Sequence, residues 1–263
     1  MISRPADFAD LGKWRLRAES GRSDRLDDIN EAMSTRDDRT HSAMSNRRRA
    51  VVVWDAPTRL FHWLVVLLVV AEYATWRLNW MDWHARAGET LLGLLFFRLL
   101  WGHFGSDTAR FSTFVASPRA GLRYLASFFR REPDNQVGHN PAGGWMVLLL
   151  LGLLLAETIS GLYVANDVAD VGPLTELVSA PIADAITALH QFLWDALLAA
   201  VSLHILAILV YALAKGQNLL GPMLTGKKRL PASVPQPHIG GATRIFFCAF
   251  FSGIAAVAIA RFL

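Results

Sequence analysis

Cysteine is nearly absent from this 263-residue chain, which holds only Cys248. A single cysteine excludes an internal disulfide framework and a Cys-x-x-Cys-His attachment for covalent haem. Charged side chains are also scarce, at 18% of residues, whereas soluble domains carry about 25%. Hydrophobic residues make up 53%, and apolar runs recur that approach the roughly 20 residues needed to span a hydrocarbon core. We therefore expect an integral membrane protein.

Nucleic-acid-binding patterns are also missing. The net charge is +4 and the pI is near 9.6, yet no zinc-finger, RNP or basic-helix signature accompanies them. The basic residues instead stand in loops beside apolar segments, where they set the orientation of membrane helices. This pattern excludes nucleic acid as a partner and leaves membrane lipid as the surroundings of the chain.

The first part of the chain has no apolar periodicity. Residues 1–50 are polar and charged, which predicts a disordered arm, and they lack the apolar core of a signal peptide. Organised sequence begins only at MSNRRRAVVVWDAP. We therefore expect the biological start at Met33 or Met44, with the upstream stretch an artefact.

An all-α membrane protein is predicted beyond this arm. A four-helix bundle should occupy residues 51–228, followed by a linker over 229–242 and an extra transmembrane helix over 243–263. That last helix has no charge between its terminal arginines, so we expect it to face lipid at the edge of the bundle. The four bundle segments are predicted at 57–78, 84–101, 144–164 and 188–214.

Loop charge predicts the orientation. Three basic clusters fall on one side of the predicted topology, whereas the loop 165–187 on the other side is acidic. The positive-inside rule makes the basic side, and with it the N-terminus, cytoplasmic. The basic residues are Arg47, Arg48, Arg49, Arg110, Arg119, Arg123, Arg130, Arg131, Lys215, Lys227, Lys228 and Arg229.

Histidines inside the apolar segments are the most informative feature. His190 and His204 are fourteen residues apart, so on a helix they share nearly one face and are separated by about 21 Å. The topology places His84 at the external level with His190, and His62 at the cytoplasmic level with His204. Ionisable residues at membrane depth indicate a functional site. Two imidazoles on facing helices at each level are what bis-histidine haem ligation in a bundle requires.

Other readings of these residues stay open. A membrane histidine can simply hydrogen-bond a neighbouring helix. A tetrahedral zinc site needs about four ligands at one place. His190 and His204 are about 21 Å apart along a helix, so one zinc site cannot include both. Arg59 and Arg98 are candidates to hold haem propionates at the inner level. The alternative is that they are ordinary arginines at helix ends whose charged groups extend to the membrane surface. Glu72 and Glu157 are either proton relays or paired structural groups. His103, His139 and His238 are predicted to lie outside the site.

Several ordered motifs resemble the prokaryotic cytochrome b561 family, which includes the b-type cytochrome subunits of nickel–iron hydrogenases. The resemblance implies a four-helix core in a bacterial inner membrane, with non-covalent haem b bound by His62, His84, His190 and His204. It also implies electron transfer between the quinone pool and a redox partner. The motifs are VWDAPTRLFHW, HARAGETLLGLLFFRLLWG, TARF, GHNPAGGWMVLLLL, LHQFLWDALLAAVSLHILAILVY and PMLTGKK.

Three functions follow for testing. The first is a dihaem cytochrome in respiratory electron transport that exchanges electrons between quinone and a partner such as a c-type cytochrome, which the acidic external loop would attract. The second is a membrane-anchor subunit of a hydrogenase or another dehydrogenase. The third, of another class, is a non-redox metal-ion transporter, although no inverted repeat is visible. Whether the chain is itself a quinone-linked oxidoreductase, and whether it forms a homodimer, stays open.

Overall fold

The computed structural model describes residues 33–34, 36, 48–127, 135–165 and 172–262. The chain divides into two units, one of residues 1–49 with 231–235 and one of residues 50–230 with 236–263. The helices that carry the predicted site all belong to the second unit. Most of the predicted disordered arm, including the alternative start at Met44, lies outside the described residues.

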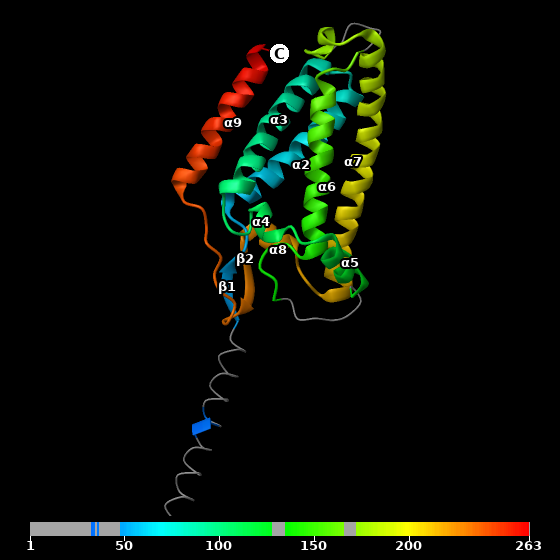
Figure 1. Cartoon of the computed structure of the whole chain (residues 1–263). Coiled ribbons are helices and arrows are strands. Elements are labelled where there is room, and N and C mark those ends of the chain that lie inside the picture. The colour runs from blue at the N-terminus through cyan, green and yellow to red at the C-terminus, as the bar shows by residue number, and fades with distance from the viewer. Residues whose placement is uncertain (1–32, 35, 37–47, 128–134, 166–171, 263) are drawn as a thin grey trace, which may run out of the picture. The chain divides into compact units, whose positions relative to one another are not determined.

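Five long helices dominate the second unit (Figure 1). In chain order they are α2 (Ala56–Arg77), α3 (Met81–Phe104), α6 (Pro141–Gly161), α7 (Ala180–Lys215) and α9 (Ala242–Phe262). Shorter elements connect them, namely α4 (Phe111–Phe114), α5 (Pro118–Ala126), the 3-10 turn η1 (Thr175–Leu177) and α8 (Leu220–Thr225).

A small sheet was not predicted. Strand β1 (Arg48–Val52) pairs with β2 (Lys227–Pro231), a two-stranded element that the all-α prediction did not include. Next to the strands, the amide of Val53 donates to the carbonyl of Gly226 over 2.8 Å. Buried apolar side chains on both strands account for the pairing, because Val51 and Leu230 are fully buried.

Local signals explain where the helices begin and end. Asp55 caps α2 by accepting the amide of Thr58 at 2.7 Å, and Asn140 caps α6 by accepting the amide of Gly143 at 2.7 Å. Helix α7 ends at Gly216, whose φ of 64° is the left-handed conformation that favours glycine. Its 36 residues reach eight residues further toward the N-terminus than predicted, because the acidic stretch before Ala188 continues the helix instead of forming a loop.

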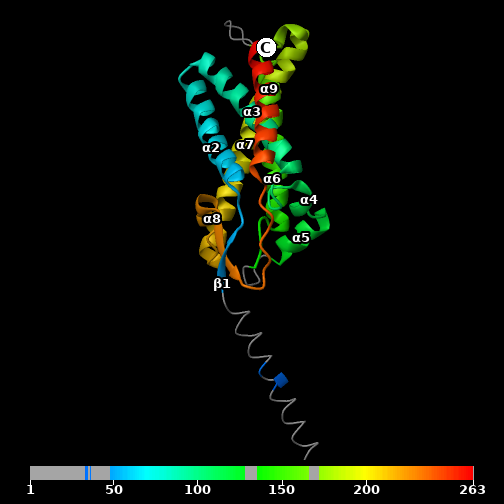
Figure 2. The ribbon, with the colours of Figure 1, turned by 90° about the vertical axis from the view of Figure 1, so that its left-hand side faces the viewer.

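Four of the described helices are long and apolar enough to cross a membrane, namely α2, α6, α7 and α9. The protein is therefore a multi-pass membrane protein. The fifth long helix, α3, has the length, but it carries Asp82, Arg86, Glu89 and Arg98. It packs against α2, α6 and α9, and α2 with α3 forms a helical hairpin (Figure 2). Its apolar middle is accordingly covered, with Leu95 fully buried.

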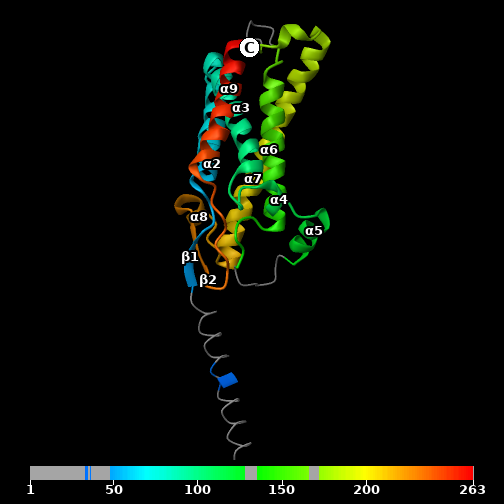
Figure 3. The ribbon, with the colours of Figure 1, turned by 60° about the vertical axis from the view of Figure 1, so that its left-hand side comes forward.

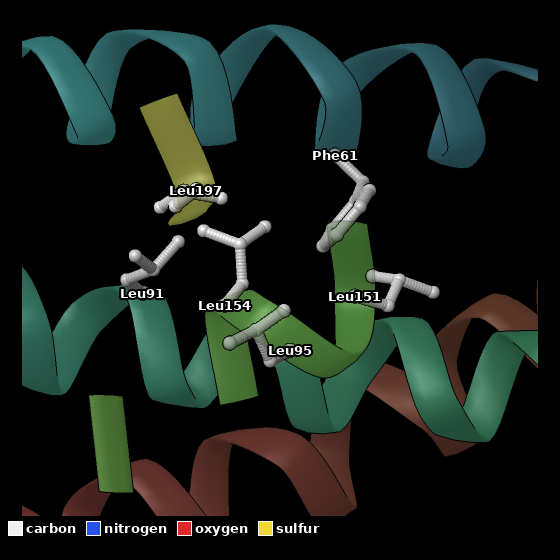
Figure 4. Packing of buried hydrophobic residues seen from close by; sticks show 6 residues of the cluster. All are labelled: Phe61, Leu91, Leu95, Leu151, Leu154 and Leu197. Carbon is white, nitrogen blue, oxygen red and sulfur yellow. The ribbon is translucent and has the colours of Figure 1, made fainter. Parts of the chain in front are cut away.

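The core of the bundle is one aliphatic layer (Figure 4). Leucine side chains from α3, α6 and α7 meet there, together with one phenylalanine from α2. Between membrane helices such side chains stabilise the contact mainly by van der Waals packing, because lipid tails are as apolar as leucine. The residues of this aliphatic layer are Phe61, Leu91, Leu95, Leu151, Leu154 and Leu197.

Helix α9 lies alongside α3, as Figures 1 and 3 show. The Ser252 hydroxyl donates to the carbonyl of Gly93 over 2.6 Å, and a Cβ at Gly93 would lie only 3.0 Å from that of Ala256. Small residues that let helix backbones approach are typical of membrane helix pairs. Cys248 is fully buried against Trp101 in the same contact. The prediction of a helix at the edge of the bundle agrees with this packing.

Substitution of Gly93 tests the α3–α9 contact. Gly93→Leu forces a side chain into Ala256, and such overpacking costs about 1–3 kcal/mol. We expect α9 to detach more often, so that Cys248 reacts with a membrane-permeant maleimide at least fivefold faster than in the wild type. Gly152→Leu is the matched control, because nothing lies within 4 Å of a Cβ there. Equal labelling rates in both variants would contradict the described packing.

Candidate functional site

Two groups of polar side chains lie inside the bundle, one on each side of the aliphatic layer. Helix α7 contributes to both, because His190 and His204 stand seven residues before and after Leu197. At about 1.5 Å per residue, each histidine is about 10 Å along the helix from the layer. The outer group contains His84 and His190, and the inner group contains His62 and His204.

In the outer group, His84 of α3 is held by Glu72 of α2. Its Nδ1 lies 2.7 Å from the carboxylate Oε2 of Glu72 and 3.2 Å from the backbone carbonyl oxygen of the same residue. Glu72 is 9% exposed, so the contact is largely shielded from water. A Cβ at Gly88 would touch Oε1 of Glu72 at 3.4 Å, so a small residue leaves space for the carboxylate. This contact ties α2 to α3.

His190 of α7 is held in a similar way by α6. Its Nδ1 lies 3.0 Å from the Ser160 hydroxyl oxygen and 3.1 Å from the carbonyl oxygen of Glu157, while its Nε2 lies 3.5 Å from Oε1 of Glu157. A Cβ at Gly161 would approach Cε1 of His190 to 3.2 Å, so glycine allows the ring its position. The Nδ1 atom is therefore engaged by α6.

The two halves of the outer group interact with each other. His84 and His190 lie within electrostatic range, as do His84 and Glu157. Four helices thus contribute one titratable group each to the same region. Sequence reasoning predicted the two histidines at one level, but it did not predict that both carboxylates contact them.

The inner group is less tightly fixed. His62 of α2 and His204 of α7 lie within electrostatic range of each other. The Nδ1 of His62 is buried and has no hydrogen-bond partner, and its ring contacts the ring of Trp63 edge-on with centroids 4.9 Å apart. The indole of Trp63 in turn donates to the carbonyl of Met223 at 3.4 Å. The pairing of His62 with His204 as ligands of one haem stays a prediction.

Arg98 and Arg59, the two predicted propionate partners, differ in their surroundings. Arg98 is 3% exposed, lies 5.0 Å from the ring centroid of Phe111 and interacts electrostatically with Asp55. Arg59 donates from Nη1 to the carbonyl of Leu224 over 2.6 Å. Each keeps a buried N–H group without a partner, namely Nη1 of Arg98 and Nε of Arg59. Such donors fit an acidic group arriving at the inner level.

His139 is the residue that sequence reasoning missed. It was expected to lie outside the site because it falls in a turn-like GHNPAGG segment. Its ring instead lies between those of Trp54 and Phe114, tilted against both, at centroid distances of 4.6 and 4.8 Å, and its Nδ1 is buried without a partner. It interacts electrostatically with His204 and Arg98. The useful signal was its position next to Asn140, which caps α6 and so fixes His139 against the bundle.

No convergent metal cluster accompanies these pairs. Within the described ranges, no three His, Cys, Asp or Glu side chains gather as ligands for one ion. The histidines instead interact two by two, His84 with His190 and His62 with His204, and two imidazoles are a ligand set that would hold a haem iron.

Helices compatible with a membrane, enclosing paired histidines, define a membrane b-type cytochrome that functions in electron transfer. The chain belongs to the prokaryotic cytochrome b561 family, whose family model matches residues 53–226. The match covers α2 to α8 and leaves α9 outside.

A curated relative agrees with this family. The probable Ni/Fe-hydrogenase B-type cytochrome subunit of Rhizobium leguminosarum bv. viciae is 27% identical over 148 residues. The alignment covers 46% of this chain and 62% of the relative, so the chain spans less than two thirds of that protein. No solved structure matches the chain.

The buried ring of His139 predicts a specific acid sensitivity. Burial, helped by the charge of Arg98 and by His204, lowers the pKa of His139 from 6.5 to about 3. The folded state therefore keeps the His139 ring neutral. The resulting contribution to the free energy of unfolding is fully present above pH 6.5 and is lost progressively as the pH falls below that value. Between pH 7.5 and 5 the loss should be about 2 kcal/mol. His139→Phe, which keeps the aromatic contacts, should lose that much less stability over the same range.

Chemical unfolding of both proteins in mild detergent, followed by tryptophan fluorescence, measures this difference. An equal loss in the wild type and in His139→Phe would show that the ring titrates without burial.

Proposed function

We propose that the chain is a dihaem b-type cytochrome of the bacterial inner membrane that passes electrons between the quinone pool and a redox partner. The observation that supports the proposal is that four interior histidines interact electrostatically two by two, His84 with His190 and His62 with His204. Each pair would hold one haem. An aliphatic layer separates the two levels.

The ring nitrogens of the outer pair support this assignment. Metal-binding histidines usually present one nitrogen to the metal and fix the other by a hydrogen bond. In His84 and His190 the Nδ1 atoms have polar partners, and the Nε2 atoms would act as ligands. Nε2 of His190 lies 3.5 Å from Oε1 of Glu157, so this carboxylate would move aside when haem binds. The inner pair lacks such partners, so its rings would be positioned mainly by packing.

Helix packing also supports the pairs. Among the described helices, α7 packs closely against α6, whereas the close neighbours of α3 are α2, α6 and α9. The two helices of each histidine pair, α2 with α7 and α3 with α7, do not share such a tight seam. A planar macrocycle held between two imidazoles needs partner helices arranged in this way.

Haem b, when bound through two imidazoles, supplies a one-electron iron couple without an open coordination position. The protein residues hold and orient it. Arg98 and Arg59 offer unpaired buried N–H donors to the propionates, and Glu72 fixes the His84 ring. The leucines of the aliphatic layer exclude water between the levels, so that electrons rather than protons cross it.

Orientation follows from loop charge. The basic residues at the end of the bundle that contains α5 and α8 place that end in the cytoplasm by the positive-inside rule. The outer group then lies toward the external face.

A second function is favoured by the curated relative, which is named as a hydrogenase cytochrome subunit. In this alternative the same histidine pairs serve a membrane anchor that receives electrons from a dehydrogenase or hydrogenase subunit.

Co-purification distinguishes the two proposed functions. A large redox subunit retained in stoichiometric amount supports the anchor, and isolation of a lone cytochrome reducible by quinol supports the first function. Membership of a cytochrome family counts against metal-ion transport.

Haem counting tests the two-level assignment. The wild type should bind two haems and show a b-type optical spectrum after reduction. His84→Ala and His62→Ala should each lose one, because each removes a ligand from a different level. His238→Ala is the control, since His238 is exposed and contacts Asp107 through its backbone amide and carbonyl, which the substitution keeps. A wild-type protein that inserts correctly without haem would contradict the proposal.

Removing the charge at Glu72 should raise the midpoint potential of the outer haem. The carboxylate favours the ferric, more positive state through His84, so Glu72→Gln should shift the potential upward by about 60 mV or more, which equals about 1.4 kcal/mol for one electron. Glu89→Gln is the matched control, because it makes the same change in α3 without a contact to His84. Redox titration of the purified proteins measures both, and equal shifts would show that Glu72 acts only through net charge.

A further inference from the structure

A pocket outside the histidine groups lies between the end of α3 and the start of α9. Its lining includes two cationic side chains, Arg110 and Arg244, and one histidine, His103. Phe104, Thr243 and Phe247 complete the lining. The positive end of the α9 helix dipole faces the same place, because α9 begins at Ala242. The pocket therefore combines positive charge with apolar walls.

The cations are only partly engaged by the protein. Arg110 pairs with Asp107 through Nη2, yet its Nε is buried without a hydrogen-bond partner. Arg244 makes one long contact of 3.4 Å from Nη1 to the carbonyl of Phe104. The Nδ1 of His103 lies 2.8 Å from the carbonyl oxygen of Leu99 and donates to it, which turns Nε2 toward other partners. Asp107 pairs with Arg110, whereas Arg244 contacts a backbone carbonyl, so the two arginines and one carboxylate leave net positive charge to attract an anion.

An apolar track leads away from the pocket along α9. The rings of Phe104 and Phe247 meet edge-on with centroids 5.8 Å apart, and Phe247 meets Phe251 at 4.6 Å. All three rings are exposed, at 51%, 44% and 48%. Ile254 continues this exposed row one turn further along the helix. A small soluble anion would use only the cationic end, whereas a ligand with a hydrocarbon tail would use both parts.

We propose that this pocket binds the phosphate of an anionic phospholipid, with Arg110 and Arg244 at the headgroup and the Phe104–Phe247–Phe251 track along an acyl chain. Basic pockets between membrane helices on the cytoplasmic side recognise such headgroups. The basic loops at this end of the bundle make it the side where anionic lipid is concentrated. A bound lipid would seal the α3–α9 contact at its open end.

Native mass spectrometry of the full-length protein tests the proposal. The protein is exchanged from phosphatidylglycerol-containing micelles into neutral detergent, and the retained lipid is counted. The wild type should keep phosphatidylglycerol and release phosphatidylcholine. Arg244→Gln should weaken retention about fivefold or more, as expected for the loss of one cation near an anionic lipid. Arg261→Gln, at the far end of α9, is the charge control and should retain the lipid.

Two further arms identify the source of the phosphate. Phe247→Ala should weaken lipid retention, whereas Phe246→Ala, which lies outside the pocket, should not. Glycerol phosphate added alone should compete poorly, because it lacks the acyl chain. Equal retention of phosphatidylglycerol and phosphatidylcholine, or competition by glycerol phosphate at lipid-like concentrations, would overturn the proposal. Haem content is measured in every variant and should stay at the wild-type value, so failure of this proposal is distinct from failure of the cytochrome assignment.

Discussion

The contact between Glu72 and His84 is the interaction on which the arrangement of the bundle depends. A carboxylate and an imidazole in an apolar helix pair are costly to bury unless each satisfies the other. Their contact fixes how α2 rotates against α3, and the contact of His190 with Ser160 and Glu157 does the same for α7 against α6. Once both helix pairs are set, the two outer histidines must occupy the same level.

The aliphatic layer then gives the two polar groups separate environments. Its leucines lie between His84 and Arg98 on α3 and between His190 and His204 on α7. The outer group includes the carboxylates of Glu72 and Glu157. Arg98 and His139 lie beside the inner group, and Asp55 is the carboxylate that interacts with Arg98. In the proposed dihaem cytochrome, opposite local charge would give the outer iron the lower potential and the inner iron the higher one.

Sequence pattern predicted a mostly helical membrane protein, because helical periodicity and membrane length are local properties. The two histidine levels stay a prediction. The pattern gave the four interior histidines, the spans of α2 and α6 to within about three residues, and α9 at the edge. It could not predict that Glu72 faces His84, because that depends on the rotation of two helices about their axes. It missed the extension of α7 before Ala188, since acidic residues also occur in exposed helical turns. It also missed the β1–β2 pairing and His139, whose burial depends on aromatic side chains from distant segments.

The uneven polarity of α3 has a consequence for how the protein reaches its membrane. A helix with Asp82, Arg86, Glu89 and Arg98 is a poor candidate to partition into lipid by itself. Its partner α2 is apolar and precedes it by a turn of only three residues, so the two helices can enter the membrane together as a hairpin in which Glu72 contacts His84. Helix α9 is synthesised last and covers the remaining flank of α3. Biogenesis of this chain is thus ordered by its least hydrophobic helix.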